Sequence, residues 1–333
     1  MQVAAVGVDI GGTDTKIALV DTEGNISNFS SIKTVDALNK REKYLEDLYS
    51  NIYKVIANTH NNCVGIGVSM LGLQMEDGSG TLCSSNAKGF KRFNIRSALQ
   101  NKFNMPIVIT NDLIAHSLAE YYFGIGKTYE RFLSVAMGTG IGCSLVLNGK
   151  PVILFGGTLG DCGRMIIDPN AKISCGMNVR GSAEALCGVR GIEYLARKYY
   201  GEDENITSRD VIARAREGKD EIAIKVMKKI GFYLGYLLAN LSVIFFPQII
   251  IISGGTVKAG PVLIEASKER FNDLVGEFHR TIGQITGTTT IDIKESVLES
   301  NAGIVGGAVP LLQSYLLKKD QKPRMKGILK SDS

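Results

Sequence analysis

Two short glycine turns, each joining one apolar strand to the next, constrain the fold of this chain more than any other feature. The first lies in VAAVGVDIGGTDTKIALV (3–20), where an apolar run meets Asp9 and then the pair Gly11–Gly12. The second lies in FLSVAMGTGIGCSLVLNGK (132–150), which repeats the order of strand, glycine turn, strand and Asn-Gly turn. Asn-Gly between β-rich runs is a strong hairpin signal. The repetition predicts two similar α/β domains.

The segments that follow these turns distinguish them from other phosphate-binding loops. A Walker A loop and a Rossmann fingerprint both run from a strand through glycines into a helix. Both turns here run into a second strand, and neither contains Gly-Lys-Ser/Thr. A tight hairpin explains either turn alone. The pair predicts two domains that face one cleft, where backbone N–H groups of each turn hold one end of a polyphosphate.

A polar pair follows a buried strand between the two turns. MPIVITNDLIAHSLAE (105–120) predicts a strand that delivers Asn111 and Asp112 to its carboxyl end and then opens a helix. Ligands of open α/β sheets bind beyond the carboxyl ends of the strands. An Asx residue at this place also suits a helix cap, so both roles stay open for Asp112. We interpret His116, one turn later, as a satisfied or exposed helix residue.

The C-terminal half offers a second glycine junction and one long apolar run. A strand at 248–252 enters SGGTVKAG (253–260), and such a strand–GlyGly–helix junction suits the edge of a nucleoside. The run 232–252 is nearly long enough to span a bilayer, but Pro247 would break a helix there. We therefore predict a buried helix followed by a buried strand. AGIVGGAVPLL (302–312) predicts a closely packed Gly/Ala helix.

Length, charge and cysteine usage limit the class of protein. The 333 residues suit about two domains. Most of the net charge of +5 lies in the tail 318–333, where six Lys and Arg stand against two Asp, and the body shows no nucleic-acid footprint. The six cysteines form no CxxC pair, and the chain enters a strand without a signal peptide. We expect a cytoplasmic protein with reduced thiols that binds neither nucleic acid nor a membrane.

The stretch GDCGRMIIDPNAKISCGMNVRGSAE (160–184) has the composition of a site rather than of a core element. Cys162 and Cys175 suggest a metal clip, and the glycines suggest a phosphate cradle. Its carboxylates, among them Asp161 and Glu184, suggest a pocket for a molecule rich in hydroxyls, because carboxylates accept hydrogen bonds from vicinal hydroxyl groups.

Taken jointly, these segments resemble the ROK family (repressors, open reading frames and sugar kinases) of the actin-like ATPase superfamily. The resemblance implies an α/β fold of two actin-like (ribonuclease H-like) domains with a ligand cleft between them. It also implies a smaller domain of residues 1–112 plus about 313–333, a larger domain of 113–312, and a homodimer. The matching pieces cover residues 3–313 in the family's order: DIGGT at Asp9–Thr13, Gly67 through Gly72, Asn86 before Gly89, NDLIAHSLAE at Asn111–Glu120, GTGIG at Gly138–Gly142 and SGG at Ser253–Gly255.

The resemblance further implies an ATP-dependent sugar kinase of the hexokinase or glucokinase type that phosphorylates a hexose or amino-hexose, usually at the 6-OH. Asp112 matches the general base, and Asp9 is expected to position Mg²⁺ through water. The implied sugar-binding residues are Gly72, Asn86, Asn111, Asp112, Asp161, Arg164 and Glu184. The implied ATP-binding residues are Asp9, Gly11, Gly12, Thr13, Lys16, Gly138, Thr139, Gly140, Gly254 and Gly255.

Two departures from the family pattern affect these expectations. In the family, a histidine and three cysteines of the 160–184 region bind a structural zinc, but here Arg164, Met177 and Ser182 replace three of them and Cys175 alone remains. Arginine does not ligate zinc, so we predict no structural zinc. Arg164 either contacts the sugar or pairs with a neighbouring carboxylate. The family's repressor branch carries a DNA-binding domain ahead of DIGGT, and eight residues precede Asp9 here, so that branch is not expected. A sugar-binding regulator without turnover remains the alternative.

Overall fold

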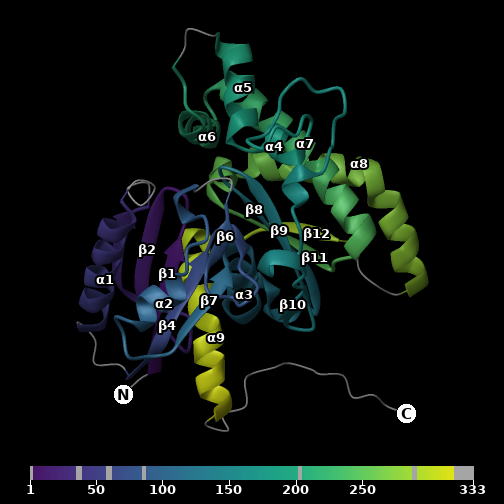
Figure 1. Ribbon diagram of the computed structural model, residues 1–333. Coiled ribbons are helices and arrows are strands. Elements are labelled where there is room, and N and C mark those ends of the chain that lie inside the picture. Colours follow the sequence, from purple (N-terminus) through teal and green to yellow (C-terminus); the bar gives the residue numbers. More distant parts are fainter. Residues whose placement is uncertain are drawn as a thin grey trace. The chain divides into compact units, whose positions relative to one another are not determined.

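A computed structural model describes residues 3–34, 40–57, 62–84, 88–201, 205–286 and 291–318 (Figure 1). Packing divides the chain into two compact units. Unit 1 comprises the described residues within Met1–Thr128, Val146–Leu159 and Ser300–Ser333, and unit 2 comprises those within Tyr129–Leu145 and Gly160–Glu299.

The sheet of unit 1 has five strands in the order β3-β2-β1-β4-β7. β2 pairs antiparallel with both β1 and β3, so the glycine turn after β1 closes a hairpin as predicted. β4 and β7 run parallel to β1. The strands are β1 (Val3–Ile10), β2 (Asp14–Asp21), β3 (Ile26–Lys33), β4 (Asn62–Met70) and β7 (Ile107–Asn111), and a separate two-stranded ribbon consists of β5 (Leu73–Gln74) and β6 (Thr81–Cys83).

Helices of unit 1 cover the sheet because β1 is apolar on both faces. Val6 and Val8 join the core cluster that includes Leu48 and Ile52 of α1 (Arg41–Ala57). The alternate residues Gly7 and Asp9 point to the opposite face, where α9 (Ala302–Lys318) packs on β1 and β4 and against α3 (Asp112–Phe123). The short α2 (Ile95–Gln100) adds its buried Ile95 and Leu99 to the same core cluster as α1.

α9 lies against its neighbours at backbone distance. A Cβ atom added to Gly7 of β1 would lie 2.3 Å from the carbonyl oxygen of Ile304, and one added to Gly67 of β4 would lie 2.0 Å from that of Gly307. A Cβ added to Gly306 would lie 1.7 Å from the carbonyl oxygen of Ala115 in α3. The predicted close packing of this Gly/Ala helix is confirmed.

Unit 2 repeats the plan of unit 1. The second sheet has the order β10-β9-β8-β11-β12, in which the β8–β9 hairpin is followed by two strands parallel to β8. The division by packing groups β10 and the last two residues of β9 with unit 1 and the rest of this sheet with unit 2. The strands are β8 (Arg131–Met137), β9 (Ile141–Leu147), β10 (Lys150–Pro151), β11 (Ile249–Ser253) and β12 (Asp292–Glu295). The helices are α4 (Ala183–Cys187), α5 (Val189–Tyr200), α6 (Ser208–Glu217), α7 (Glu221–Phe245) and α8 (Pro261–Thr286).

Short 3-10 turns across the chain are η2 (Lys88–Phe90), η3 (Ile125–Thr128), η4 (Phe155–Gly157), η5 (Cys162–Arg164), η6 (Gly255–Ala259) and η7 (Glu299–Asn301).

The long apolar run forms the helix and strand that the sequence predicts. α7 ends at Phe245, and Phe246 adopts a left-handed conformation with φ of 45° just before Pro247. The following β11 is buried along its whole length. None of the helices in the described part of the chain combines the length and the apolar character that a membrane crossing requires.

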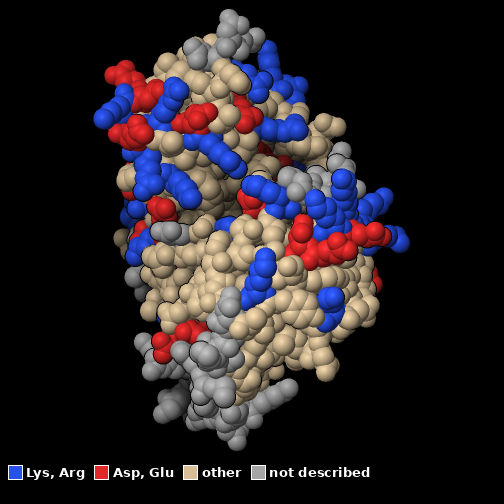
Figure 2. All heavy atoms as spheres, turned by 90° about the vertical axis from the view of Figure 1, so that its left-hand side faces the viewer, with Lys and Arg blue, Asp and Glu red and all other residues tan. Residues whose placement is uncertain are grey.

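Charged side chains of both signs lie next to one another on the face shown in Figure 2. Exposed ion pairs in the described part of the chain include Lys33 with Asp14 at 2.6 Å and Lys294 with Asp292 at 3.4 Å. Exposed pairs of this kind typically contribute about 0–1 kcal/mol each. The two apolar cores therefore dominate the stability of the fold.

The division by packing differs from the domain boundaries expected from the sequence. Residues 113–128 and 300–312 group with unit 1, because α3 and α9 pack against each other and α9 packs on β1 and β4. Both segments were expected in the larger domain. Amphipathic patterning shows that a helix has a buried face but does not show which sheet that face covers.

Because α9 packs at backbone distance, we predict that Gly306→Ala lowers the free energy of unfolding by about 1–3 kcal/mol. The added methyl group would overlap the carbonyl of Ala115, which is backbone and cannot turn away. Urea denaturation measures the change. Gly276→Ala in α8 is the matched control, because its Cβ would meet its nearest neighbour at 3.5 Å. The control should be neutral or stabilising by about 0.5–1 kcal/mol. Equal effects of the two substitutions would contradict the prediction.

Candidate active site

In unit 1, three parallel strands deliver the predicted site residues to one edge of the sheet. The register pairs Asp9 of β1 with Ser69 of β4, and Met70 of β4 with Asn111 of β7. The carboxyl ends of these strands therefore lie side by side. Asp9, Gly72, Asn111 and Asp112 are brought together at this edge, as the sequence suggested, whereas Asn86 lies outside the described residues.

The Asp9 carboxylate is held from two sides. The Ser69 hydroxyl donates a hydrogen bond to Oδ1 of Asp9 at 2.9 Å. Gly303, at the start of α9, leaves room for the carboxylate, since a Cβ at residue 303 would lie 2.3 Å from the same oxygen. A fixed, half-buried carboxylate suits Mg²⁺, which prefers oxygen ligands and keeps part of its water shell. Ser69 and Gly303 were not predicted as site residues, although a lone hydroxyl near the end of a buried strand was a usable signal.

The glycine turn beside Asp9 is tight and open to solvent. The amide of Gly11 donates to the carbonyl of Asp14 at 3.2 Å, while Gly12 and Thr13 are exposed. Lys16 stands opposite Asp9 in the hairpin register, and its Nζ donates to the carbonyl of Ser300 at 2.8 Å. The turn thus presents backbone groups, and its lysine ties β2 to the segment that leads into α9.

Asn111, and not Asp112, caps α3. Its Oδ1 accepts hydrogen bonds from the amides of Leu113 and Ile114 at 3.0 and 3.4 Å, and its Nδ2 donates to the carbonyl of Gly72 at 3.0 Å. The Asn111 side chain is 2% exposed and fully engaged. The Asp112 carboxylate accepts a hydrogen bond from the amide of Leu113 at 3.0 Å and remains partly exposed. The capping role that was open for Asp112 therefore belongs to its neighbour.

The surroundings of Asp112 shift its titration towards neutrality. Burial raises the pKa of Asp112 from 3.8 to about 7, and the negative charge of Asp9 acts in the same direction. The hydrogen bond from the amide of Leu113 opposes the shift. A carboxyl group that titrates near pH 7 is suited to accept a proton during catalysis, and such shifted groups cluster at functional sites.

His116 differs from our sequence interpretation. The side chain is half-buried rather than exposed, and its Nδ1 atom has no hydrogen-bond partner among the described residues. Burial lowers the pKa of His116, although the nearby Asp9 acts in the opposite direction. His116 is therefore a neutral imidazole close to the Asp9 carboxylate, and it is not a satisfied helix residue.

In unit 2, the two predicted nucleotide-binding turns emerge from neighbouring parallel strands. Ala136 of β8 pairs with Ser253 of β11, so the turn at Gly138–Gly140 and the pair Gly254–Gly255 leave the same edge. The amide of Gly138 donates to the carbonyl of Gly140 at 2.9 Å, and Thr139 is exposed. Gly254 has φ of +101°, and a Cβ there would lie 2.2 Å from the carbonyl oxygen of Met137. No other residue type fits at position 254.

The stretch 160–184 is organised around the Arg164 guanidinium. Its Nη1 lies 2.5 Å from Oε1 of Glu184, and its Nε lies 3.2 Å from Oδ2 of Asp161. The Arg164 and Glu184 side chains are 21% and 12% exposed, whereas Asp161 is 57% exposed. Of the two roles that were open for Arg164, pairing with the neighbouring carboxylates is observed, and it involves both of them.

Backbone contacts close this stretch on itself. The amide of Ala183 donates to the carbonyl of Met165 at 2.8 Å, beside a β-bridge between Ile166 and Ser182. The Ser182 hydroxyl accepts a hydrogen bond from the amide of Ala185 at 3.3 Å and caps α4. Glu184, in the first turn of α4, is thereby fixed relative to Arg164.

The four positions that correspond to the family's zinc ligands are used in other ways. Arg164 pairs with carboxylates, Ser182 caps a helix, Met177 is 59% exposed and Cys175 is buried. In the described ranges, no group of three or more His, Cys, Asp or Glu side chains is placed to hold a metal ion. Cys162 instead hydrogen-bonds with Cys143 of β9, a contact that the sequence spacing did not suggest.

The two sheets define the structural class. Each sheet has five strands. The first three include a hairpin that a glycine turn closes, and the other two run parallel to the first strand of that hairpin. This repeated arrangement is the actin-like two-domain α/β fold. The profile of the ROK family matches residues 5–314, and the chain belongs to this family.

Three known proteins illustrate the relationship. A glucokinase of Halalkalibacterium halodurans is 26% identical, with 97% of each chain covered. A xylose repressor of Bacillus subtilis is 24% identical over 81% of this chain and 69% of its own length. The crystal structure of a ROK family glucokinase from Streptomyces griseus in complex with glucose and AMPPNP has a TM-score of 0.79 at 21% identity, covering 93% of this chain and 99% of that one.

The unequal burial of the two partners of Arg164 leads to a prediction from double-mutant cycles. The coupling free energy between Arg164→Met and Glu184→Gln should be about 1–3 kcal/mol, because both groups are largely withdrawn from water. The coupling between Arg164→Met and Asp161→Asn should be about 0–0.5 kcal/mol, because Asp161 is well solvated. Urea denaturation of the single and double variants gives both values. A larger coupling with Asp161 would contradict the assignment of Glu184 as the main partner.

The raised pKa of Asp112 also predicts how stability depends on pH. The folded state binds the Asp112 proton more tightly than the unfolded state does. The contribution of this group to the free energy of unfolding is therefore fully present below about pH 4, where the carboxyl is neutral in both states. It is lost as pH rises through about 7. Asp112→Asn should therefore be more stable than the wild type at pH 8. Its advantage should grow by about 1–3 kcal/mol between pH 5 and pH 8.

Urea denaturation at the two pH values tests this expectation. The control is Asp47→Asn on the exposed face of α1, which should change stability by less than about 0.5 kcal/mol at both pH values. An Asp112→Asn variant that is less stable than the wild type at pH 8 would show that the folded state does not disfavour the charge.

Proposed function

We propose that this protein is an ATP-dependent sugar kinase that transfers the γ-phosphoryl group to a hydroxyl of a hexose or amino-hexose, at the 6-OH. The observation that carries the proposal is Asp112, a carboxyl with a pKa of about 7 at the strand edge that also presents Asp9 and a glycine turn. The glucokinase relative, which is matched over nearly its whole length, supports the same class of reaction.

The proposed chemistry follows from the properties of the reacting groups. A sugar hydroxyl is a weak nucleophile, so a base must accept its proton as the oxygen attacks the γ-phosphorus. Asp112 accepts that proton in its ionised form, and Asn111 fixes its position by capping the helix that Asp112 begins. Asn111 also orients the carbonyl of Gly72, which we propose as a contact for the sugar hydroxyls.

We propose that the glycine turns hold the phosphates of ATP. Backbone amides of Gly11–Thr13 and of Gly138–Gly140 suit oxyanions, and Gly254–Gly255 suit the nucleoside. Asp9 would hold Mg²⁺ through water, and the bound ion would offset negative charge on the phosphates. Lys16 supports the first turn through its bond to the carbonyl of Ser300.

The sugar contacts proposed in unit 2 come from the stretch around Arg164. Asp161 and Glu184 offer carboxylate oxygens to sugar hydroxyls, while Arg164 keeps both carboxylates in place. In this proposal the ion pairs brace the loop without a structural zinc. Asn86, beyond the described residues, is proposed as a further sugar contact.

The alternative proposal is a sugar-binding regulator of the same fold without turnover. The specific observation in its favour is the engagement of Glu184 by Arg164, which leaves fewer free acceptor sites for a sugar. The similarity to a xylose repressor shows that regulators exist among the relatives. A carboxyl tuned to pH 7 at position 112 favours the kinase, because binding alone does not need a proton acceptor.

The kinase proposal predicts a selective loss of turnover in Asp112→Asn. We expect kcat to fall by about 10²–10⁴-fold, since the amide cannot accept the proton, while sugar affinity stays within a few-fold. In the wild type, kcat should fall about tenfold for each pH unit below an apparent pKa near 7, because protonation removes the base. A coupled assay for ADP release and calorimetric titration of the sugar measure these quantities.

The assay requires a screen of hexoses, amino-hexoses and polyols, with Asp47→Asn as the variant that should keep wild-type kinetics. Near-wild-type turnover of Asp112→Asn would rule out the assigned base. Absence of turnover with every sugar, together with measurable sugar binding, would favour the regulator.

A further inference from the structure

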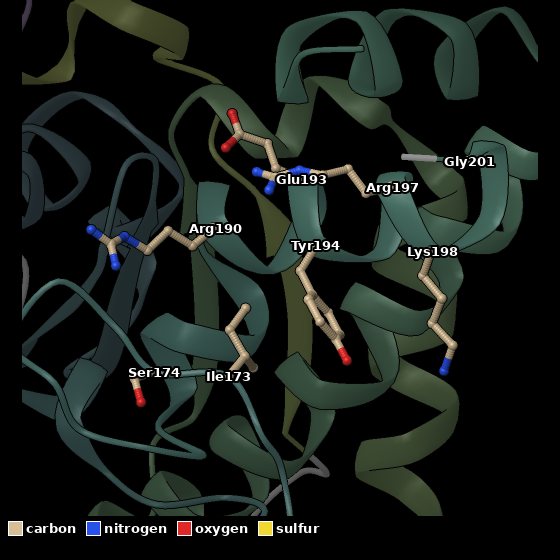
Figure 3. A pocket seen from close by; sticks show the side chains of 8 residues that line it. All are labelled: Ile173, Ser174, Arg190, Glu193, Tyr194, Arg197, Lys198 and Gly201. Carbon is tan, nitrogen blue, oxygen red and sulfur yellow. The ribbon is translucent and has the colours of Figure 1, made fainter. Parts of the chain in front are cut away.

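A pocket lies in unit 2, between α5 and the loop residues Ile173 and Ser174 (Figure 3). Its volume is about 850 Å³, which is in the range of small-molecule sites, roughly 300–1,000 Å³. None of its lining residues is among the site residues inferred from the sequence. The pocket is therefore distinct from the sites inferred for the sugar and ATP.

The pocket is basic, and its cations are unpaired. Arg190, Arg197 and Lys198 are all exposed side chains of α5 that line it. Across the described residues, none of the three forms an ion pair or a side-chain hydrogen bond, although Lys198 lies 6.0 Å from the ring centre of Tyr199. Cations that gather without partners on the wall of a concave site favour an anionic ligand.

The three basic residues occupy separate positions along the helix. Arg190 precedes Arg197 and Lys198 by seven and eight residues, which corresponds to about 10–12 Å along the helix axis. Figure 3 shows Arg190 at one end of the group and Lys198 at the other, with Tyr194 between them. Tyr194 is 45% exposed, and Glu193 precedes it on the same wall.

This order of groups matches a ligand with an anion at each end and hydroxyls in the middle. Guanidinium and ammonium groups bind phosphate oxygens strongly. The Glu193 carboxylate and the Ser174 hydroxyl accept hydrogen bonds from hydroxyl groups, and the aromatic ring of Tyr194 offers an apolar surface to the C–H face of a sugar. A continuous chain of phosphates would instead meet repulsion from Glu193.

We propose that this pocket binds a sugar bisphosphate, with one phosphate near Arg190 and the other near Lys198, whose side chains lie at opposite ends of the group in Figure 3. The ends of the pocket supply positive charge, and its centre supplies the acceptors and the ring that a polyol requires. The assignment does not depend on turnover at Asp112.

The two walls of the pocket connect directly to the candidate active site of unit 2. α5 begins after Gly188, where a Cβ would lie 2.7 Å from the carbonyl oxygen of Glu184 and 3.1 Å from that of Thr139. The opposite wall continues through a β-bridge between Ser174 and Arg180 towards the cap of α4. A ligand that contacts both α5 and the loop at Ser174 would therefore restrain the two segments that flank Glu184.

Calorimetric titration of the full chain with fructose 1,6-bisphosphate, without ATP, tests the proposal. We expect one site per chain, with affinity at least about tenfold higher than for fructose 6-phosphate or inorganic phosphate, because a second charge-assisted contact is worth about that factor. Arg190→Ala and Lys198→Ala should each weaken binding by about tenfold. Arg209→Ala, an exposed arginine of α6 outside the pocket, should leave binding unchanged.

Three results would overturn the proposal. These are the absence of binding, equal affinity for the bisphosphate and inorganic phosphate, and binding that Arg190→Ala and Lys198→Ala leave unaffected. The last result would place the ligand at another site, such as the catalytic one. Circular dichroism of the surface variants confirms that they remain folded. Since no turnover is measured, failure of the kinase proposal does not affect the outcome.

Discussion

Contact between backbones, rather than between side chains, is the constraint on which unit 1 depends. α9 approaches β1, β4 and α3 so closely that glycine is required on both sides of the contact, at Gly7 and Gly67 in the strands and at Gly306 in the helix. The same approach brings Gly303 against the Asp9 carboxylate. The packing of a C-terminal helix thus determines where an N-terminal acidic group lies, although almost 300 residues separate them along the chain.

Arg164 illustrates how a positive group can organise two carboxylates in a small loop. A guanidinium offers several donors in a fixed plane, so a single side chain can contact Glu184 and Asp161 at once. The unequal burial of the two acids means that the guanidinium is anchored mainly by Glu184. The more exposed Asp161 is held less firmly than Glu184, although both carboxylates share the same guanidinium.

The sequence predicted those parts of the structure that depend on short segments. The two strand–glycine–strand hairpins, the strand that ends at Asn111 and the helix–strand sequence around Pro247 all follow from local pattern and turn chemistry. The sheet on which α3 and α9 pack could not be predicted, because burial patterns do not identify the partner surface. The hydrogen bond from Ser69 to Asp9 and the thiol contact between Cys143 and Cys162 join segments that are separated along the chain. The position of Ser69 near the end of a buried strand was a usable signal, but sequence spacing did not identify the partner in either contact.

The cap at Asn111 has a consequence for the dynamics of the candidate base. The side chain of Asn111 holds the first turn of α3 and the carbonyl of Gly72 at the same time, and Asp112 begins that turn. Any local opening of the turn therefore releases the base and the neighbouring glycine in one event, without unfolding the sheet. The amide protons of Leu113 and Ile114 are bonded to the same oxygen. Their exchange with solvent deuterium consequently reports the fraction of molecules in which this part of the site is assembled.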